Sequence, residues 1–308
     1  MFDSLFSRSG LSLDRLRGFM EMANAGSIAR AAPGDANHQS QISRQIRELE
    51  QFFGVELTRR KGKTLTLSAA GVRLAALVRE QFQDLEDFRR EQAREAKSFL
   101  IGAGASVLEW LVVPALPGIS QCLGGATLLT GAYRSGTLRE AVRDGQADLA
   151  VIRQNAVPME NDSAVVMKMG YFLCIPRGLL KRGITAREAA KPALWQSLPF
   201  AAGRDGGQTD AAVREAMRAA GVGFRPRFEC GSMLQVRQLV ALGACAGVLP
   251  TLGVRGLEEQ DVLTIPFAPM KDFGRALVLH WNPRQMRRRN VDEATLKGIA
   301  RLLRGGAG

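Results

Sequence analysis

The chain contains few of the residues that build metal centres, disulfide frameworks or aromatic cores. Its 308 residues include 4 Cys and 2 His, and only 6% are aromatic. The cysteines form no Cys-x-x-Cys pair and no zinc-finger spacing with the histidines, and the chain is far too long for a disulfide scaffold. We therefore expect reduced, mostly buried thiols and no metal or other cofactor; redox sensing at Cys230 or Cys245 is the alternative.

Segments that direct proteins to membranes are missing too. The N-terminal MFDSLFSRSG has no basic region followed by an apolar one, so it predicts no secretory signal. No apolar run approaches the length of a transmembrane helix. We therefore expect a soluble, cytoplasmic protein with no membrane partner.

Enzyme motifs are equally absent. There is no G-x-S-x-G nucleophile elbow, and no lysine of the phosphate-binding-loop type follows a glycine run. The stretch GAGASV at residues 102–107 begins like a dinucleotide-binding loop but lacks the third glycine. These absences predict a protein that is not an enzyme.

Acidic residues are too few to balance the basic ones. The 42 Lys and Arg exceed the 30 Asp and Glu, and the net charge of +12 favours a polyanionic partner. Residues 11–74 hold ten basic and six acidic residues, and residues 271–304 hold nine and three. In the second segment we expect the run Arg287-Arg288-Arg289 to be a solvated loop or helix start; the alternative is that it adds non-specific attraction to DNA.

The first seventy residues carry closely spaced helix signals. Ser12 can cap a helix that begins at Leu13, and Gly26-Ser27 can end that helix and cap a short one over residues 28–32. A turn at residues 33–35 precedes a third helix, which begins near His38 and ends at Gly54. The residues expected to face inward are Leu13, Leu16, Met20 and Ala23 in the first helix and Ile42, Ile46, Leu49 and Phe53 in the third.

A basic-tipped hairpin follows these helices. Residues 57–60 and 63–67 alternate apolar and polar side chains across Gly62. Two helices joined by a tight turn and followed by such a hairpin are typical of a winged helix-turn-helix. The polar face of the third helix, rich in Gln, Ser and Arg, suits base edges and phosphates, and the alternative is an ordinary solvated surface.

These residues resemble the winged helix-turn-helix of LysR-type transcriptional regulators, without a gap over residues 16–71. The matching pieces are Leu16-Arg17-Gly18-Phe19, Gly26-Ser27-Ile28, Arg30-Ala31-Ala32, Gln39, Ile42-Ser43-Arg44-Gln45-Ile46, Leu49-Glu50, Phe53-Gly54-Val55-Glu56-Leu57 and Leu65-Thr66-Leu67-Ser68-Ala69-Ala70-Gly71. The chain departs from the family at residues 33–40, where Pro33 and Gly34 should end the second helix early and Asp35 replaces an apolar anchor. This departure bears on the tilt of the reading helix and its preferred DNA sequence.

The resemblance implies DNA contacts on the reading helix, the helix before it and the wing. Gln39 corresponds to a base-reading residue, Arg44 to a base or phosphate contact, and Arg30 to an arginine near the DNA backbone. The alternative for each is an exposed, solvated side chain. The predicted DNA-binding residues are Arg30, His38, Gln39, Ser40, Ser43, Arg44, Arg47, Lys61 and Lys63.

A long helix should run from Ser68 to about Lys97. Its apolar residues keep a three-four spacing that suits a partner helix, and packing against the chain's own winged domain is the alternative. In the family this helix pairs two subunits, so the resemblance implies a homodimer or a dimer of dimers. The residues of this seam are Leu74, Val78, Leu85 and Phe88, with Gln81 and Gln92 beside them.

From Phe99 onward, strands and helices alternate and predict two α/β lobes joined by two crossovers. The predicted strands are 99–103, 126–130, 149–152, 165–169, 247–249 and 275–279 with others near Phe200 and Phe228, and the predicted helices begin near Ser106 and Ser135 and span 209–220, 233–242 and 291–303. This pattern resembles the periplasmic-binding-protein-like module that binds a small molecule in its cleft.

Ligands of such modules gather where strands end and helices begin. The family positions that line the effector cleft correspond to Ser106, Ser135 and Arg153, and the loop 203–209 and the helix start at Ser232 are candidates in the second lobe. N-capping is the alternative for both serines of the first lobe. Arg153 favours a small anionic effector such as a carboxylate. The predicted effector-binding residues are Ser106, Ser135, Arg153, Gly203, Arg204, Ser232 and Met233.

The fold class is therefore α/β overall, with an N-terminal, mainly α-helical winged helix-turn-helix. We expect a DNA-binding domain at 11–67, a linker and dimerisation helix at 68–97, and a two-lobed effector-binding domain at 98–308 (lobe 1 about 98–165 and 270–308, lobe 2 about 166–269). The predicted function is a LysR-type regulator that binds promoter DNA, contacts RNA polymerase and responds to a small-molecule effector. The alternatives are an architectural DNA-binding protein and a solute-binding protein.

Overall fold

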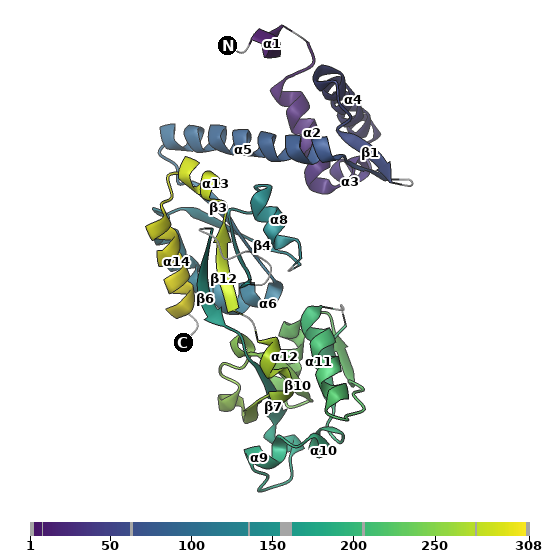
Figure 1. Cartoon of the computed structure of the whole chain (residues 1–308), viewed down its shortest axis with the longest axis vertical. Coiled ribbons are helices and arrows are strands. Elements are labelled where there is room, and N and C mark those ends of the chain that lie inside the picture. The colour runs from purple at the N-terminus through teal and green to yellow at the C-terminus, as the bar shows by residue number, and fades with distance from the viewer. Residues whose placement is uncertain are drawn as a thin grey trace. The chain divides into compact units, whose positions relative to one another are not determined.

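The computed structural model describes residues 3–7, 9–61, 64–134, 136–154, 162–204, 207–274 and 276–305. The chain divides into two compact units (Figure 1). The first comprises residues 1–97 and the short stretch 144–146, and the second comprises the rest. Among the described residues, no helix is both long enough and apolar enough to cross a membrane.

Helices and one antiparallel hairpin make up the first unit. Ser12 and Ser27 cap α2 and α3, because each hydroxyl accepts a hydrogen bond from a backbone N–H three residues on. Gly26 and Gly54 end α2 and α4 in the left-handed conformation. These limits confirm the helix-turn-helix and the wing. The elements are α1 (Asp3–Phe6), α2 (Leu13–Ala25), α3 (Ile28–Ala31), α4 (Ala36–Phe53), β1 (Thr58–Lys61), β2 (Thr64–Leu67) and α5 (Ala69–Gln92).

Helix α4 ends before Gly54, as predicted, but its start and the burial of its last turn differ from the prediction. It begins two residues before His38, because the Asp35 carboxylate accepts a hydrogen bond from the His38 N–H at 2.9 Å and caps the helix. The residue that departs from the family pattern thus acts as a helix cap. At the other end Phe52 is buried and Phe53 is 39% exposed, because the segment at Gly10 packs against Phe52.

The core of the first unit draws mainly on α2 and α4. Leu13 was expected to face inward but is 64% exposed. The buried residues of α2 lie further along the helix, at Gly18, Phe19, Met20 and Met22. The other predicted inward positions of α4 are confirmed as buried. The buried core residues are Phe19, Met20, Met22, Ala32, Ile42, Ile46, Leu49, Leu57, Ala75 and Val78.

Helix α5 starts where predicted and stops earlier. The Ser68 hydroxyl caps it by accepting a hydrogen bond from the Gly71 N–H at 3.0 Å. A Cβ at Gly71 would lie 2.0 Å from the carbonyl oxygen of Leu57, so only glycine lets α5 pass this close to the wing. The helix ends at Gln92, because Arg94 adopts the left-handed conformation with φ of 55° and a helix cannot continue through it.

The first lobe of the second unit is built on a five-stranded sheet with the order β4-β3-β5-β12-β6. Strands β3, β4 and β5 run parallel, as predicted, and β12 runs antiparallel to β5 and β6. The predicted lobe limit near residue 165 falls inside β6. The elements are β3 (Ser98–Ala103), α6 (Ala105–Val107), the π-helical turn η1 (Leu108–Val112), α7 (Val113–Cys122), β4 (Thr127–Ala132), α8 (Leu138–Arg143), β5 (Leu149–Arg153), β6 (Ser163–Lys168), β12 (Ala276–Trp281), α13 (Pro283–Arg288) and α14 (Glu293–Gly305).

The second lobe contains another five-stranded sheet, with the order β11-β7-β10-β8-β9. Strand β10 pairs in parallel with β8 and antiparallel with β7. Strands β7 and β11 have no counterpart among the predicted elements. The elements are β7 (Tyr171–Pro176), η3 (Arg177–Leu179), α9 (Ala186–Ala189), α10 (Pro192–Trp195), β8 (Phe200–Gly203), α11 (Gln208–Ala219), β9 (Phe228–Cys230), α12 (Met233–Ala241), β10 (Ala246–Pro250), η4 (Thr251–Gly253), η5 (Glu258–Gln260), β11 (Val262–Pro266) and η6 (Ala268–Phe273).

The two connections between the lobes lie against each other. The chain leaves the first lobe at Met169 and Gly170 and returns at Gly274. A Cβ at Gly274 would lie 2.5 Å from the carbonyl oxygen of Met169, so only glycine allows this approach. The Gly170 N–H donates to the hydroxyl of Thr251, just after β10, at 2.9 Å. These contacts hold the two connections together between the lobes.

A buried ion pair holds the end of α13 against the first sheet. Arg289 is only 2% exposed, and its Nη1 donates to Oδ1 of Asp148 at 2.7 Å. Its Nη2 donates to the Ser98 carbonyl oxygen at 2.6 Å, and its guanidinium lies 3.9 Å from the centre of the Phe99 ring. The expectation of a solvated run is therefore wrong for Arg289, because a buried carboxylate balances its charge. Arg287 is exposed, as expected.

Candidate DNA-binding surface and ligand cleft

The face of α4 opposite the core carries exposed polar side chains. Ser40, Arg44 and Arg47 are exposed, and Ser43 is half-buried. Arg47 donates through Nη2 to the Ser43 hydroxyl and through Nε to the Ser43 carbonyl, both at 3.3 Å. In the described part of the chain, the side chains of Ser40 and Arg44 have no partner. An arginine of this kind, on the exposed face of a helix, can donate to phosphates or to guanine acceptors.

The first turn of α4 is tied to both preceding helices. Nε2 of Gln39 donates to the Ala32 carbonyl oxygen at 2.7 Å, at the end of α3. Nε2 of His38 lies 3.0 Å from Oε2 of Glu21 on α2, which is an ion pair when His38 is protonated. The amide oxygen of Gln39 remains available as an acceptor. Two predicted DNA contacts therefore also hold the helix-turn-helix together.

Glu50 anchors the wing to α4. Its Oε1 accepts hydrogen bonds from the N–H groups of Leu57 and Thr58 at 2.9 and 3.0 Å and from the Thr58 hydroxyl at 3.1 Å. Three donors on one ionised oxygen fix the start of β1 firmly, because hydrogen bonds to charged groups are stronger than neutral ones. Glu50 thus sets the orientation of the wing relative to α4, a structural role that the sequence alone did not predict.

The remaining predicted DNA contacts are only partly described. Arg30 on α3 is exposed. Lys63 and the side chain of Lys61 lie outside the described residues. Arg59 and Arg60 on β1 are exposed and add positive charge to the wing.

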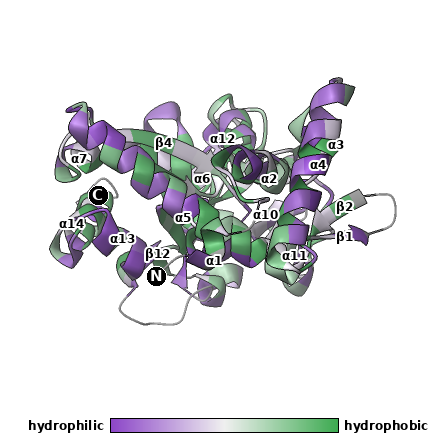
Figure 2. Cartoon of the chain, turned by 90° about the horizontal axis from the view of Figure 1, so that it is seen from above, coloured by the Kyte–Doolittle hydropathy of each residue, from purple (hydrophilic) through white to green (hydrophobic). Residues whose placement is uncertain are grey.

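Helix α5 buries the first half of its apolar seam and exposes the second. Val78 is buried in the core of the first unit, and Leu74 packs against that core. Leu85 and Phe88 are 56% and 62% exposed. Hydrophobic and hydrophilic residues alternate along this helix in Figure 2. The first half of the helix thus packs against the chain's own winged domain. The second half leaves an apolar surface exposed, of the kind that another subunit can cover.

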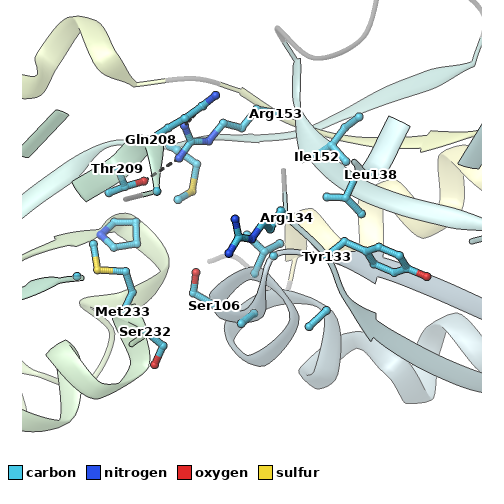
Figure 3. A pocket seen from close by; sticks show the side chains of 18 of the residues that line it. Ser106, Tyr133, Arg134, Leu138, Ile152, Arg153, Gln208, Thr209, Ser232 and Met233 are labelled. Carbon is cyan, nitrogen blue, oxygen red and sulfur yellow. Dashed lines mark hydrogen bonds between the residues drawn. The ribbon is translucent and has the colours of Figure 1, made fainter. Parts of the chain in front are cut away.

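A cavity of about 560 Å³ lies between the two lobes of the second unit. This volume is in the usual range for small-molecule sites. Its walls come from the ends of strands in the first lobe and from the starts of α11 and α12 in the second (Figure 3). The lining residues include Ser106, Arg134, Leu138, Val151, Ile152, Arg153, Tyr171, Gly203, Gln208, Thr209, Asp210, Ser232, Met233 and Leu277.

Most of the residues predicted for the cleft line this cavity. They are Ser106, Arg153, Gly203, Ser232 and Met233. Arg204 is exposed and does not belong to the lining, and Ser135 lies outside the described residues. Sequence reasoning missed Arg134 and Tyr171. Arg134 follows β4 closely, as Arg153 ends β5, and this position was the available signal; Tyr171 begins a strand that was not predicted.

The two serines at the cavity play different parts. The Ser232 hydroxyl accepts a hydrogen bond from the Gln235 N–H at 3.3 Å and caps α12. Ser106 is not a cap, because Gly104 occupies that position of α6. Within the described chain the Ser106 hydroxyl has no partner. The N-capping alternative is therefore wrong for Ser106, whose hydroxyl remains available to a ligand.

Arg153 reaches from the first lobe to the second. Its Nη2 donates to the hydroxyls of Thr209 at 2.8 Å and Tyr171 at 3.4 Å, and its Nη1 donates to Oε1 of Gln208 at 3.1 Å. The guanidinium also lies 5.3 Å from the centre of the Phe273 ring. The bond to Thr209 is visible in Figure 3. Arg153 therefore links the lobes across the cavity.

Three of the four thiols, those of Cys174, Cys230 and Cys245, are buried, whereas Cys122 is exposed. Burial raises the pKa of Cys174 to about 12 and that of Cys245 to about 11. Burial also raises the pKa of Cys230 above its ordinary value. Because the thiolate is the reactive form, these shifts disfavour redox sensing. Among the described residues, no group of three or more His, Cys, Asp or Glu is placed to hold a metal ion.

A winged helix-turn-helix followed by a two-lobed α/β module defines a ligand-responsive DNA-binding protein. Residues 13–72 match the family "Bacterial regulatory helix-turn-helix protein, lysR family", and residues 92–294 match "LysR substrate binding domain". The chain belongs to the LysR family of transcriptional regulators.

Relatives and solved structures agree with this assignment. The chain is 28% identical to the "RuBisCO operon transcriptional regulator" of Acidithiobacillus ferrooxidans over 249 residues, which is 79% of each chain. Its fold is similar to that of a full-length OxyR variant from Pseudomonas aeruginosa, with a TM-score of 0.61, 20% identity and coverage of 94% and 95%. It is also similar to full-length CbnR in complex with its target DNA, with a TM-score of 0.55, 19% identity and coverage of 94% and 100%.

Proposed function

We propose that this regulator binds promoter DNA through α4 and the wing and that a small anion in the cleft modulates this binding. The observation that carries the DNA-binding part is the exposed face of α4, where Ser40 and Arg44 have no partner within the described chain. The opposite face is buried, so this surface is free for the major groove. The proposed contacts are Arg30, His38, Gln39, Ser40, Ser43, Arg44, Arg47, Lys61 and Lys63.

The proposed roles within this surface differ. Arg44 donates to a base or phosphate, and the amide oxygen of Gln39 accepts from a base. To use its amide protons as well, Gln39 must exchange its bond with the Ala32 carbonyl for one with DNA. Arg30 and the wing lysines contact the DNA backbone and supply salt-dependent affinity.

The effector-binding part of the proposal rests on the cavity between the lobes. The hydrogen-bond partners of Arg153 in the described part of the chain are all neutral, so an anionic ligand would complement its charge. By displacing bonds to Thr209 and Gln208, such a ligand would change how the lobes are held together. We assign Ser106, Ser135, Arg153, Gly203, Arg204, Ser232 and Met233 to this site or its rim.

Dimerisation completes the proposal. Leu85 and Phe88 expose apolar surface on α5 and fit a second copy of this helix. A dimer, or a pair of dimers, places two reading helices on two half-sites about one helical turn apart. The proposed DNA-binding, linker and effector-binding regions are 11–67, 68–97 and 98–308. We also propose that the DNA-bound regulator contacts RNA polymerase.

Fluorescence anisotropy across a salt series tests the DNA-binding part, using the chain's own upstream DNA and a scrambled duplex. We expect much tighter binding to the upstream DNA and a steep salt slope on both. Arg44→Ala should weaken specific binding by about 10- to 100-fold, because a good arginine contact is worth about 1–3 kcal/mol. Arg187→Ala, an exposed arginine of α9 in the second lobe, is the matched control and should leave binding unchanged.

Two outcomes would contradict this proposal. Equal affinity for both duplexes would favour an architectural DNA-binding protein that does not read sequence. An Arg44→Ala variant that binds upstream DNA as tightly as the parent would remove α4 as the reading element. In either case the cleft could be examined separately, because ligand binding can be measured on the protein in the absence of DNA.

A further inference from the structure

Two arginines face the cavity, and among the described residues neither has an acidic partner. The partners of Arg153 are hydroxyl and amide groups and an aromatic ring. Arg134 is exposed to the cavity, and its side chain has no partner among the residues that the structure describes. Arg289 shows the contrast, because this buried arginine is paired with Asp148. Within the described chain, neither arginine therefore has a carboxylate as a hydrogen-bond or ion-pair partner.

The acidic residue of the lining does not balance these charges. Asp210 is buried, and its Oδ1 accepts a hydrogen bond from the Gly203 N–H at 3.1 Å. A Cβ at Gly203 would lie 2.1 Å from that oxygen, so the carboxylate packs directly on the end of β8. Asp210 thus serves the local structure of the second lobe. In the described lining, it is the one acidic side chain against two arginines.

The register of the first sheet sets the spacing of the two arginines. Ala103 of β3 pairs with Ala132 of β4 and with Val151 of β5. Arg134 lies two positions after Ala132, and Arg153 lies two positions after Val151. Both arginines therefore lie just beyond the same edge of the sheet. Because β3 lies between their strands, their backbones are about 10 Å apart, which is twice the strand spacing.

Both side chains can reach one ligand. Figure 3 shows Arg134 directed into the cavity beside Ser106, and Arg153 directed toward Thr209 on the far wall. The cavity also has apolar lining from Leu138, Val151, Ile152 and Leu277. A ligand that fits this arrangement has two anionic groups and an apolar segment between them. A guanidinium binds a carboxylate in a bidentate manner, which adds geometric selectivity at each end.

We propose that the cleft binds a small organic dianion of the dicarboxylate class, with one anionic group at Arg153 and the other at Arg134 and Ser106. This inference rests on the proposed function of the cleft and adds the second anion subsite. Arg134 is then the residue that selects dianions over monoanions. A ligand with a single carboxylate would leave one of the two guanidinium charges without a partner.

Calorimetric titration of the full-length protein tests this selectivity. The probes are succinate, glutarate and adipate, their chain-matched monocarboxylates butyrate, pentanoate and hexanoate, and inorganic phosphate. We expect the best dicarboxylate to bind at least tenfold more tightly than its monocarboxylate. Arg134→Gln should weaken dicarboxylate binding by about 10- to 100-fold, the range of one charge-assisted contact, and leave monocarboxylate binding nearly unchanged.

Arg187→Gln is the matched control. Arg187 is an exposed residue of α9 that does not line the cavity, so this variant should keep the preference for the dicarboxylate. Urea midpoints measured by tryptophan fluorescence show whether both variants remain folded. All three tryptophans, Trp110, Trp195 and Trp281, lie in the second unit and report on it directly.

Four results would overturn the inference. They are equal affinity for both acids of a pair, a preference that survives in Arg134→Gln, tighter binding of inorganic phosphate than of any dicarboxylate, and no binding of any acid by protein that binds its upstream DNA. Dicarboxylate binding with the predicted loss in Arg134→Gln, in protein that fails to bind DNA, would support the subsite and refute the DNA-binding proposal. The two proposals can therefore fail independently.

Discussion

Replacing Arg289 by methionine should destabilise the second unit strongly, although the residue belongs to a run of arginines near the end of the chain. Arg289 donates to the Asp148 carboxylate and to the Ser98 carbonyl oxygen, and it stacks on the Phe99 ring. The side chain of Arg289 is 1% exposed and that of Asp148 is 10% exposed. Methionine fills much of the same space and removes the charge, so Asp148 remains buried without its cation.

The expected loss in the free energy of unfolding is the cost of leaving the Asp148 carboxylate buried without its cation. Removing one partner of a buried ion pair costs about 3–5 kcal/mol. Gln285 still donates to the same oxygen of Asp148 at 2.7 Å, and the Leu100 N–H donates to the other at 2.7 Å, which favours the lower half of that range. A loss of about 3 kcal/mol is a large share of the 5–15 kcal/mol that stabilises a typical domain.

Urea unfolding followed by tryptophan fluorescence measures this loss, because the tryptophans lie in the second unit alone. With an m-value of about 3 kcal/mol/M, the midpoint should fall by about 1 M. Arg287→Met is the matched control, since Arg287 is exposed and its replacement should change the free energy of unfolding by less than about 0.5 kcal/mol. Equal midpoints for Arg289→Met and Arg287→Met would refute the reasoning. The double variant Asp148→Asn with Arg289→Met should recover part of the loss, because it leaves no buried charge and the amide oxygen still accepts a hydrogen bond from Leu100 or Gln285.

Two further predictions concern titratable groups. Burial lowers the pKa of His280 below its ordinary value of 6.5, so the unfolded chain binds a proton that the folded chain does not. The free energy of unfolding should therefore fall as the pH drops below 6.5, and less steeply in His280→Gln; equal slopes in urea titrations would contradict this. Burial raises the pKa of Cys174 and Cys245, so iodoacetamide at about pH 8 should label exposed Cys122 and spare these two in the folded protein, as read by mass spectrometry. Rapid labelling of Cys245 would reopen the redox alternative.

Local signals in the sequence correctly predicted most helix limits of the first unit. Ser12 and Ser27 were predicted as helix caps and are caps, Gly54 ends α4 as predicted, and the long helix begins at Ser68 as predicted. Such signals succeed because a cap satisfies backbone donors within a few residues of its own position. The stripe formed by Ile42, Ile46 and Leu49 was equally readable, because one period of 3.6 residues places them on one face.

Errors arose where distant segments decide burial. Phe53 fits the apolar stripe of α4, yet Phe52 is buried, because the segment at Gly10 covers it. Asp35 was interpreted as a departure from the family pattern. In the structure its carboxylate accepts a hydrogen bond from the His38 N–H and caps α4. Arg289 stood in a charged run that suggested solvent, and its carboxylate partner lies 141 residues earlier.

The cleft was foreseen in outline from the alternation of strands and helices. Five of the seven predicted effector residues line the cavity, because residues at the ends of parallel strands meet at one edge of a sheet. Arg204, next to Gly203, is exposed and does not belong to the lining. Arg134 was missed because its importance depends on sharing a strand register with Arg153.

By itself the sequence determined the family, the helix-turn-helix with its wing, and the presence of two α/β lobes, because caps, periodicity and local motifs act over short distances. The tertiary structure alone decided which side chains are paired and which charges remain free. Arg289 is neutralised by Asp148, whereas Arg134 and Arg153 face a cavity with no acidic partner in the described chain. Charge compensation depends on contacts between residues far apart in the sequence, and only the folded chain brings those residues together.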